Sequence, residues 1–226
     1  MQRAYFITGT DTGVGKTSVA VALLQAATKC GLSTAAVKPV AAGCEMTDEG
    51  LRNDDALYLQ QACSTALSYA QINPFALQPP IAPHFAAARQ GLHLDAQQLA
   101  THCQSVLDLK ADLTLIEGAG GWRVPLNESE SFADMAKLLA VPVILVVDIK
   151  LGCLNHALLS AEGIRADGLL LAGWVANQAS GVNECHAEMV ADLQGRLACP
   201  LLADLPHRLN QNELAADFDL SVLQAT

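Results

Sequence analysis

The residues best suited to chemistry form the sequence GVGKT at residues 13–17. An apolar run at residues 5–9 precedes them and a helical pattern of apolar residues follows, which is the strand–loop–helix context of a phosphate-binding loop. Glycines let backbone N–H groups converge on phosphate oxygens, and the helix N-terminus adds partial positive charge. In such a loop Lys16 reaches the β- and γ-phosphates and the Thr17 hydroxyl holds Mg²⁺. The chain is therefore predicted to bind a nucleoside triphosphate with Mg²⁺.

The start of this loop departs from the usual pattern Gly-x-x-x-x-Gly-Lys-[Ser/Thr]. Thr10 stands where the first glycine is expected, and Gly9 lies one residue too early. The partition and septum-site ATPases carry an additional lysine at the position of Asp11, where this chain has the opposite charge. A dimerisation-driven switch of that kind is therefore disfavoured. The small polar side chains at residues 10–12, Thr12 among them, indicate that the loop also faces a second, polar ligand.

A second lysine follows another apolar run. Lys38 ends the run at residues 33–38, and Pro39 after it disfavours a helical conformation for Lys38. Ligands of an open parallel sheet lie beyond the carboxyl ends of its strands, so Lys38 is expected opposite Lys16. Two ammonium groups could then flank one anionic centre. The alternative is a solvated surface lysine.

Acidic residues that suit Mg²⁺ lie at comparable positions. Glu117 ends the apolar run at residues 112–117 and is followed by glycines, which allow close backbone approach to a γ-phosphate. Asp54 and Asp55 precede a predicted helix. Mg²⁺ typically takes one or two carboxylates and completes its shell with water and phosphate oxygens. Either aspartate could instead be a helix N-cap.

Two further sites at predicted strand ends suit other parts of a ligand. The sequence GCLN at residues 152–155 begins a predicted helix, and small residues with an amide at a helix start suit a carboxylate. Cys153 and His156 are expected to be structural. Asn177 ends a strand, and its amide offers both a donor and an acceptor to the edge of a nucleobase. A turn or cap is the alternative role for Asn177.

Strand and helix patterns alternate along the whole chain. Apolar runs such as residues 143–147 lack polar alternation, which indicates buried parallel strands covered by helices on both faces. The expected strands are residues 5–9, 33–38, 112–117, 142–148, 168–176 and 201–205. The expected helices are residues 15–29, 54–62, 94–108, 131–140, 154–165 and 183–197, with a short one in the tail. Residues 69–91, rich in Pro, Ala and Gln, are expected to be a long irregular connection. This order predicts one α/β domain over residues 1–226 with a doubly wound, mostly parallel sheet.

Composition excludes several classes of protein. The formal net charge of −10, from 13 Lys and Arg against 23 Asp and Glu, argues against nucleic-acid binding. No apolar run approaches the ~20 residues of a membrane span, and no secretory signal segment is expected. Seven scattered cysteines without a Cys-x-x-Cys pair are typical of reduced thiols in a cytoplasmic protein.

Six stretches in chain order are specific as a set. They are GTDTGVGKT, KPVAAG, RNDDA, EGAGGW, PVILVVDIKLGCLNHALL and GWVAN. The set resembles the dethiobiotin synthetase family of biotin biosynthesis, and the likeness covers nearly the whole chain. The resemblance implies a cytoplasmic homodimer of single phosphate-loop NTPase-like domains with shared active sites. It also implies an ATP-dependent cyclo-ligase that converts 7,8-diaminononanoate, CO₂ and Mg²⁺-bound ATP to dethiobiotin through a carbamate and a carbamic–phosphoric anhydride.

The resemblance further implies roles for individual residues. Lys38 and Lys16 would be catalytic, and Thr17, Asp55 and Glu117 would hold Mg²⁺. The ATP contacts would be Gly13, Val14, Gly15, Lys16, Thr17, Ser18, Asp55, Glu117, Gly118, Ala119, Gly120, Asn177, Pro206, His207, Arg208 and Glu213. The diamine substrate would contact Thr12, Lys38, Gly152, Cys153 and Asn155, with the turn at residues 152–155 supplied by the partner subunit.

Two positions depart from the family pattern. Ala42 stands where the family often has Ser or Thr, and Gly13 where it often has Glu. Losing one hydroxyl contact at residue 42 costs roughly 0.5–1.5 kcal/mol unless Cys44 or a backbone N–H replaces it. Neither change removes a charged catalytic group.

Two other functions remain open. One is a phosphate-loop amide ligase for a larger carboxylate, although such enzymes often carry a glutaminase domain for which this chain has no room. The other is a nucleotide-dependent switch or metal-insertion chaperone, which would turn over ATP slowly without a small substrate.

Overall fold

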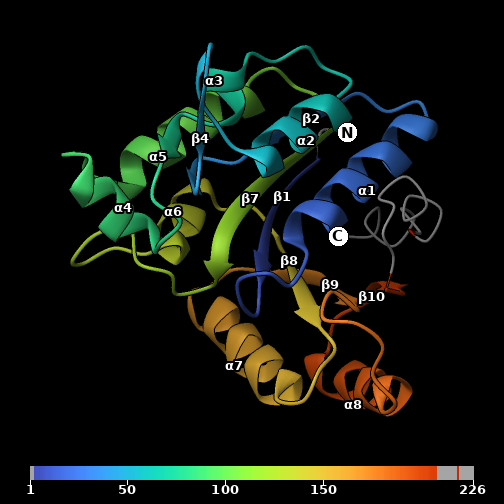
Figure 1. Cartoon of the computed structure of the whole chain (residues 1–226). Coiled ribbons are helices and arrows are strands. Elements are labelled where there is room, and N and C mark those ends of the chain that lie inside the picture. Colours follow the sequence, from blue (N-terminus) through green and yellow to red (C-terminus); the bar gives the residue numbers. More distant parts are fainter. Residues whose placement is uncertain (1–2, 208–217, 219–226) are drawn as a thin grey trace.

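The structure, a computed structural model, describes residues 3–207 and 218. Among these residues the centre is a six-stranded sheet in the order β10-β9-β8-β1-β7-β2, with every strand pair parallel (Figure 1). The strands are β1 (Arg3–Gly9), β2 (Thr34–Val37), β3 (Val40–Ala42), β4 (Glu45–Thr47), β5 (Gly50–Arg52), β6 (Phe75–Leu77), β7 (Leu113–Gly121), β8 (Val143–Asp148), β9 (Leu171–Asn177) and β10 (Leu201–Leu205). The helices are α1 (Lys16–Lys29), α2 (Asp54–Ala62), α3 (Tyr69–Ile72), α4 (Pro83–Arg89), α5 (Ala96–Leu107), α6 (Phe132–Leu139), α7 (Cys153–Ala166) and α8 (His186–Leu197). The predicted α/β fold with a parallel sheet is confirmed.

Helices cover both faces of this sheet. Helix α1 packs on β1, β2 and β7 and against α2, while α5 and α6 pack together on the other side (Figure 1). Helix α7 packs on β8 and β9 and against α8. Every residue of β8 and β9 is buried as a result. This double cover explains why the apolar runs of the sequence lack polar alternation.

The carboxyl ends of the strands meet at one edge, as the topology requires. Gly9 of β1 pairs with Gly121 of β7, and Asp148 of β8 pairs with Asn177 of β9. The prediction that Glu117 ends its strand is wrong, because β7 continues to Gly121. Pairing with β1 extends β7, through a register shift, so the glycines stay in the strand.

The prediction of an irregular connection over residues 69–91 is also wrong. This segment contains α3, β6 and α4, and β6 pairs in parallel with β3 to form a small second sheet. Ser68 and Gln71 form a capping box that begins α3, and Pro83 occupies the first turn of α4. Elements of three to seven residues are too short to produce a visible hydrophobic period, so the pattern missed them.

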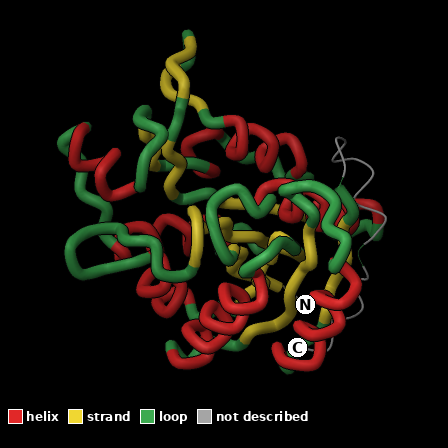
Figure 2. Tube along the Cα trace, turned by 60° about the horizontal axis from the view of Figure 1, so that its bottom comes forward, coloured by secondary structure: helices red, strands yellow, loops and turns green. Residues whose placement is uncertain are grey.

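The hairpin of β4 and β5 was not predicted either. It projects from the body of the molecule (Figures 1 and 2). Met46 on this hairpin is exposed. The helix expected in the tail lies outside the described residues. Within the described part of the chain, no helix combines the length and apolar character needed to cross a membrane.

Candidate active site

The phosphate-binding loop joins β1 to α1. Gly13 and Gly15 have φ angles of +77° and +88°, a region that glycine enters without steric cost. A Cβ on Gly15 would lie 2.2 Å from Nδ2 of Asn177, so space also excludes a side chain there. Asn177 donates from Nδ2 to the carbonyl oxygen of Val14 at 2.8 Å. The end of β9 therefore supports the loop directly, while the nucleobase contact of Asn177 stays a prediction.

Lys16 opens α1 and is almost completely buried. Its Nζ donates to the backbone oxygen of Asp11 at 3.0 Å. Burial lowers the pKa of Lys16 to about 8, with Glu117 opposing this effect and Lys38 reinforcing it. The buried ammonium group of Lys16 has lost most of its hydration. A phosphate oxygen would therefore be a stronger hydrogen-bond acceptor for it than the carbonyl oxygen of Asp11.

Lys38 lies at the centre of a charged cluster. It follows β2 directly, and its Nζ lies 2.5 Å from Oε1 of Glu117 and 3.0 Å from Oδ2 of Asp55. Thr17 donates from Oγ1 to the same Oε1 atom of Glu117 at 2.8 Å. Burial opposes the charge of Lys38, but the two carboxylates outweigh burial and raise its pKa above the usual value. The pKa of Asp55 is lowered, since Lys38 and Thr17 outweigh the opposing effect of burial.

The same cluster fits a hard divalent cation. Oε2 of Glu117 is buried and has no hydrogen-bond partner among the described residues. A buried carboxylate oxygen without a partner is costly, and Mg²⁺ accepts such an oxygen readily. Thr17, Asp55 and Glu117 can supply a hydroxyl and two carboxylates, and water with phosphate oxygens can complete the shell. The residues present therefore suit Mg²⁺ bound together with a nucleotide.

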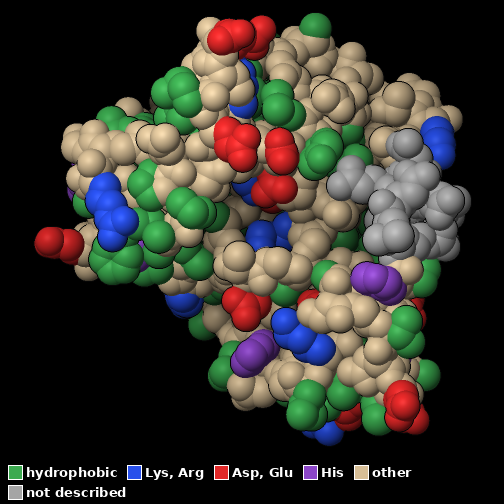
Figure 3. Space-filling model, viewed as in Figure 1, with side chains coloured by type: hydrophobic (Ala, Val, Ile, Leu, Met, Phe, Trp, Pro, Cys, Tyr) green, Lys and Arg blue, Asp and Glu red, His purple; other side chains and the backbone are tan. Residues whose placement is uncertain are grey.

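These residues line one cavity of about 660 Å³ at the carboxyl edge of the sheet. Figure 3 shows basic and acidic side chains gathered at the hollow in the middle of this face. The lining includes Thr12, Ser18 and Ala42 besides the two lysines and both carboxylates. Cys44 is buried and donates its thiol to the carbonyl of Ala41 at 3.3 Å. That thiol is therefore engaged and does not replace the hydroxyl missing at residue 42.

The glycine segment of β7 contributes in two ways. Ala119 and Gly120 line the cavity, and their contact with the phosphates stays a prediction. Gly118 instead packs under Phe6, because a Cβ there would lie 2.9 Å from Cζ of that ring. Gly118 thus serves the packing of the core against β1.

Other predicted residues lie at the same edge but beyond the cavity. Leu205 pairs with Asn177, which places Pro206 and His207 beside the loop-supporting end of β9. Nδ1 of His207 lies 2.9 Å from the carbonyl oxygen of Gln178. Arg208 and Glu213 lie outside the described residues.

The predicted carboxylate-binding turn is not brought to the cavity within one chain. Gly152 and Asn155 are exposed at the start of α7, next to Leu151, which is 91% exposed. Cys153 is buried and faces Sδ of Met189 at 3.8 Å. Burial raises the pKa of Cys153, which disfavours the thiolate form.

Sequence reasoning missed the part of the lining that comes from residues 80–83 and from Val124. Pro80, Ile81, Ala82 and Pro83 belong to the segment 69–91 that was expected to be irregular. The available signal was the unusual length of that segment, since long connections in compact domains are usually functional. It also missed Tyr69 and Asn73, which lie behind the cluster.

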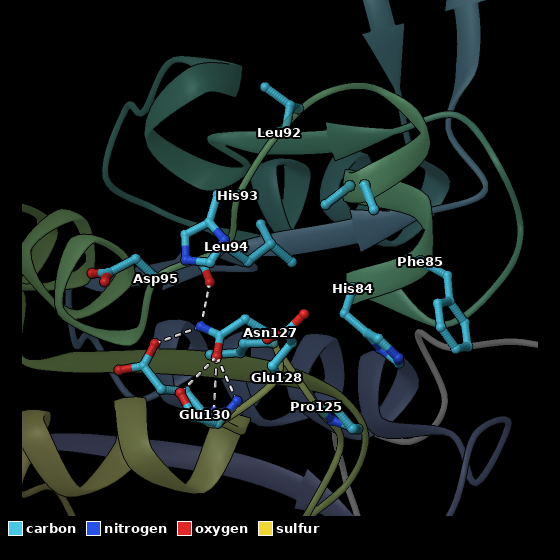
Figure 4. Close-up of a pocket in the computed structure, with 14 residues that line it drawn as sticks. His84, Phe85, Leu92, His93, Leu94, Asp95, Pro125, Asn127, Glu128 and Glu130 are labelled. Carbon is cyan, nitrogen blue, oxygen red and sulfur yellow. Dashed lines mark hydrogen bonds between the residues drawn. The ribbon is translucent and has the colours of Figure 1, made fainter.

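A second cavity of about 970 Å³ lies between residues 84–95 and residues 125–130 (Figure 4). Asn127 holds its walls together by donating from Nδ2 to the carbonyl of Leu94 at 2.8 Å and to Oε2 of Glu130 at 2.6 Å. Its lining, as far as the chain is described, contains no lysine or arginine. Such cations form strong hydrogen bonds to phosphate, and the smaller cavity has two lysines and the phosphate-binding loop. The smaller cavity is therefore the candidate nucleotide site.

A phosphate-binding loop at the edge of a parallel sheet, next to two buried lysines and two carboxylates, defines a phosphate-loop nucleotide-binding protein. The ATP-dependent dethiobiotin synthetase BioD of Pseudomonas aeruginosa strain UCBPP-PA14 is 56% identical over 223 residues, 97% of each chain. The enzyme of the same name from Pseudescherichia vulneris is 46% identical over 226 residues, 99% of this chain and 94% of the relative. This chain belongs to the dethiobiotin synthetase family. A family model described as AAA domain matches residues 3–213.

Solved structures agree with the fold. MinD of Aquifex aeolicus superposes with a TM-score of 0.56 at 14% identity, covering 99% of this chain and 90% of that one. FtsY of Thermotoga maritima gives 0.56 at 14% identity, covering 98% and 67%. Identities this low show a shared phosphate-loop architecture and nothing finer.

Proposed function

We propose that this protein is an ATP-dependent dethiobiotin synthetase, which closes a ureido ring on 7,8-diaminononanoate with CO₂ and ATP. The observation that carries the proposal is one cavity that joins the phosphate-binding loop to the buried Lys38–Glu117–Asp55 cluster. Such a cavity can hold an anionic phosphoryl group and a second, polar reactant side by side. The curated relatives support the same activity through their names.

The reaction proceeds in three steps. One amine adds to CO₂ and loses a proton, which gives a carbamate. A carbamate oxygen then attacks the γ-phosphorus and ADP departs, which gives a carbamic–phosphoric anhydride. The second amine attacks the carbamoyl carbon and loses a proton, and inorganic phosphate departs as the ring closes. Holding two amines and an activated carboxyl group together can contribute roughly 7–11 kcal/mol at best.

The residues of the cavity match the charges of these steps. Lys16 and Lys38 would stabilise the negative carbamate and the transferring phosphoryl group, together with the N-terminus of α1. Thr17, Asp55 and Glu117 would hold Mg²⁺, which when bound neutralises charge on the β- and γ-phosphates. Thr12 lines the same cavity, and it is proposed to contact the diamine.

This protein is proposed to act as a homodimer, in which each subunit is a single domain spanning residues 1–226. The turn at residues 152–155 presents a helix N-terminus to solvent and does not contribute to the cavity lining of its own chain. In a dimer it could bind the substrate carboxylate at the partner's cavity, so that Gly152, Cys153 and Asn155 complete a shared site. Asn177, Pro206, His207, Arg208 and Glu213 are proposed to surround the nucleoside, and the enzyme is proposed to be cytoplasmic.

The test is ADP release from ATP and Mg²⁺ with bicarbonate, with and without 7,8-diaminononanoate, together with mass analysis of the organic product. ADP formed only with the diamine, alongside a product of dethiobiotin mass, is the expected result. Turnover that is indifferent to the diamine and gives no new product would overturn the proposal and favour a nucleotide-driven switch.

A further inference from the structure

A series of buried and partly buried hydrogen bonds leads from the backbone of Lys38 to the start of α2. The backbone N–H of Asn53 donates to Oη of Tyr69 at 2.8 Å, and that hydroxyl donates to Oδ1 of Asn73 at 3.1 Å. Asn73 in turn donates from Nδ2 to the backbone oxygen of Lys38 at 2.8 Å. Three consecutive hydrogen bonds therefore join the backbone of Lys38 to that of Asn53, and we call these three bonds the relay.

One end of this series of hydrogen bonds is Lys38, and the other end lies two residues before Asp55. Lys38 and Asp55 form an ion pair. Asn53 is the N-cap of α2, and Asp55 is the second residue of that helix. Lys38 is the first residue after β2. Nζ of Lys38 and Oδ2 of Asp55 are 3.0 Å apart. Each end of the relay thus holds the backbone that delivers one partner of this pair.

The polar groups of the relay are paired with one another. Asn73 is only 3% exposed, and a buried amide or hydroxyl is costly unless its partners are in place. The two side chains in the middle of the relay belong to α3, where Tyr69 is the first residue and Asn73 the C-cap. The capping box of α3 and the backbone bond from Lys38 N to Ile72 O at 2.8 Å hold this helix in place. Linked hydrogen bonds also strengthen one another. Burial raises the pKa of Tyr69, so its hydroxyl stays a donor.

We propose that Tyr69 and Asn73 are positioning residues that set the approach of Lys38 to Asp55. Neither side chain lines the cavity, so both act through the backbone of the residues they hold. The inference rests on the roles proposed above for Lys38 and Asp55. It assigns a task to the first part of segment 69–91.

The direct test is Tyr69→Phe, which removes one oxygen and leaves the N–H of Asn53 and Oδ1 of Asn73 without their partner. We expect kcat for dethiobiotin formation to fall about 10- to 100-fold. The Mg²⁺ concentration for half-maximal rate should rise as well, because Asp55 shifts. The KM for the diamine should change far less. The matched control is Tyr58→Phe, the same chemical change at a 43% exposed position on α2, which should leave kcat and the Mg²⁺ dependence unchanged.

A second variant tests the relay from its other end. Asn73→Ser removes the donor to the carbonyl of Lys38 and should lower kcat in the same way. If both residues act through one chain, the double variant should lose less than the product of the two single losses. A merely structural role would lower the melting temperature without changing kcat of the folded enzyme or its Mg²⁺ dependence.

Two outcomes separate this inference from the assignment beneath it. If Lys38→Ala still forms dethiobiotin, the proposed site is wrong whatever Tyr69→Phe does. If Lys38→Ala is inactive while Tyr69→Phe and Asn73→Ser keep kcat and the Mg²⁺ dependence within about twofold of the parent, the positioning inference alone is overturned.

Discussion

Nζ of Lys38 lies 2.5 Å from Oε1 of Glu117, and both side chains are almost wholly buried. The two residues are 79 positions apart in the sequence. They meet because β2 and β7 are neighbours in the sheet. Removing one partner of a buried pair leaves the other charge without compensation, which typically costs about 3–5 kcal/mol.

Replacing Lys38 should strengthen the binding of Mg²⁺ to the carboxylates of Glu117 and Asp55. We expect Lys38→Met to abolish dethiobiotin formation and to lower the free energy of unfolding by about 3 kcal/mol. Mg²⁺ without nucleotide should then raise the melting temperature of Lys38→Met more than that of the parent, since no ammonium competes for Glu117 and Asp55. Thermal unfolding with and without Mg²⁺ measures this. The control is Lys137→Met, which removes the half-exposed partner of Asp134 and should show no such difference. Equal Mg²⁺ effects in all three proteins would contradict the prediction.

Substitutions at Gly120 and Gly91, which have similar φ angles, can distinguish the effect of backbone strain from that of steric crowding. Gly120 has a φ of +61° and Gly91 a φ of +68°, so alanine at either position costs about 1–2 kcal/mol. A Cβ on Gly120 would also lie 2.7 Å from Cγ2 of Val124, whereas one on Gly91 would meet nothing within 4 Å. We expect Gly120→Ala to lower kcat/KM for ATP at least about tenfold, and Gly91→Ala to lose stability only. Urea unfolding combined with steady-state kinetics checks both, and equal kinetic effects would refute the crowding argument.

Asp167 anchors the chain that leaves the glycine segment of β7. Its Oδ2 accepts from Nε1 of Trp122 at 2.8 Å and pairs with Nη1 of Arg123 at 2.9 Å. Asp167→Ala should lower the free energy of unfolding by about 2–3 kcal/mol, because a buried indole donor loses its acceptor. Asp192→Ala is the control, since Asp192 pairs with Arg196 on the surface of α8 at 2.8 Å and should cost less than about 0.5 kcal/mol. Chemical denaturation measures both values, and a similar loss of unfolding free energy in the two variants would contradict the prediction.

The cysteines should differ sharply in reactivity. Burial raises the pKa of both Cys63 and Cys103 to about 12, so only about one such thiol in ten thousand is ionised at pH 8. Cys30 and Cys185 are exposed. Alkylation at pH 8 should therefore modify Cys30 and Cys185 first, as peptide mass mapping would reveal. Rapid modification of Cys103 in the native protein would contradict this.

The same pKa shifts predict a loss of stability in base. An unfolded cysteine ionises near the ordinary thiol pKa of 9.0, while burial raises the pKa of Cys103 to about 12. Between these values the native state binds more protons, so the free energy of unfolding falls as pH rises. Urea unfolding at a series of pH values measures the slope, and replacing Cys103 by alanine should reduce it.

The phosphate-binding loop and the parallel sheet could be predicted because their signals are local. The spacing of GVGKT, the positive φ that Gly13 and Gly15 must adopt, and the unbroken apolar residues of β8 each reflect a few neighbouring residues and their burial. The strand ends also marked Lys38 and Glu117 as candidates, and resemblance to a family implied their particular roles. No spacing could reveal their contact with each other.

Only the tertiary structure decided how these parts meet. The sequence determined that a lysine follows one strand and that a carboxylate lies on another, but their 2.5 Å approach depends on strand order and register. The same holds for the relay from Lys38 to Asn53, in which α3 is too short to show a hydrophobic period and is stabilised by caps and by the segments it joins. Local pattern determines the elements because backbone geometry repeats over a few residues. Contacts between distant segments follow from packing, to which every element of the core contributes.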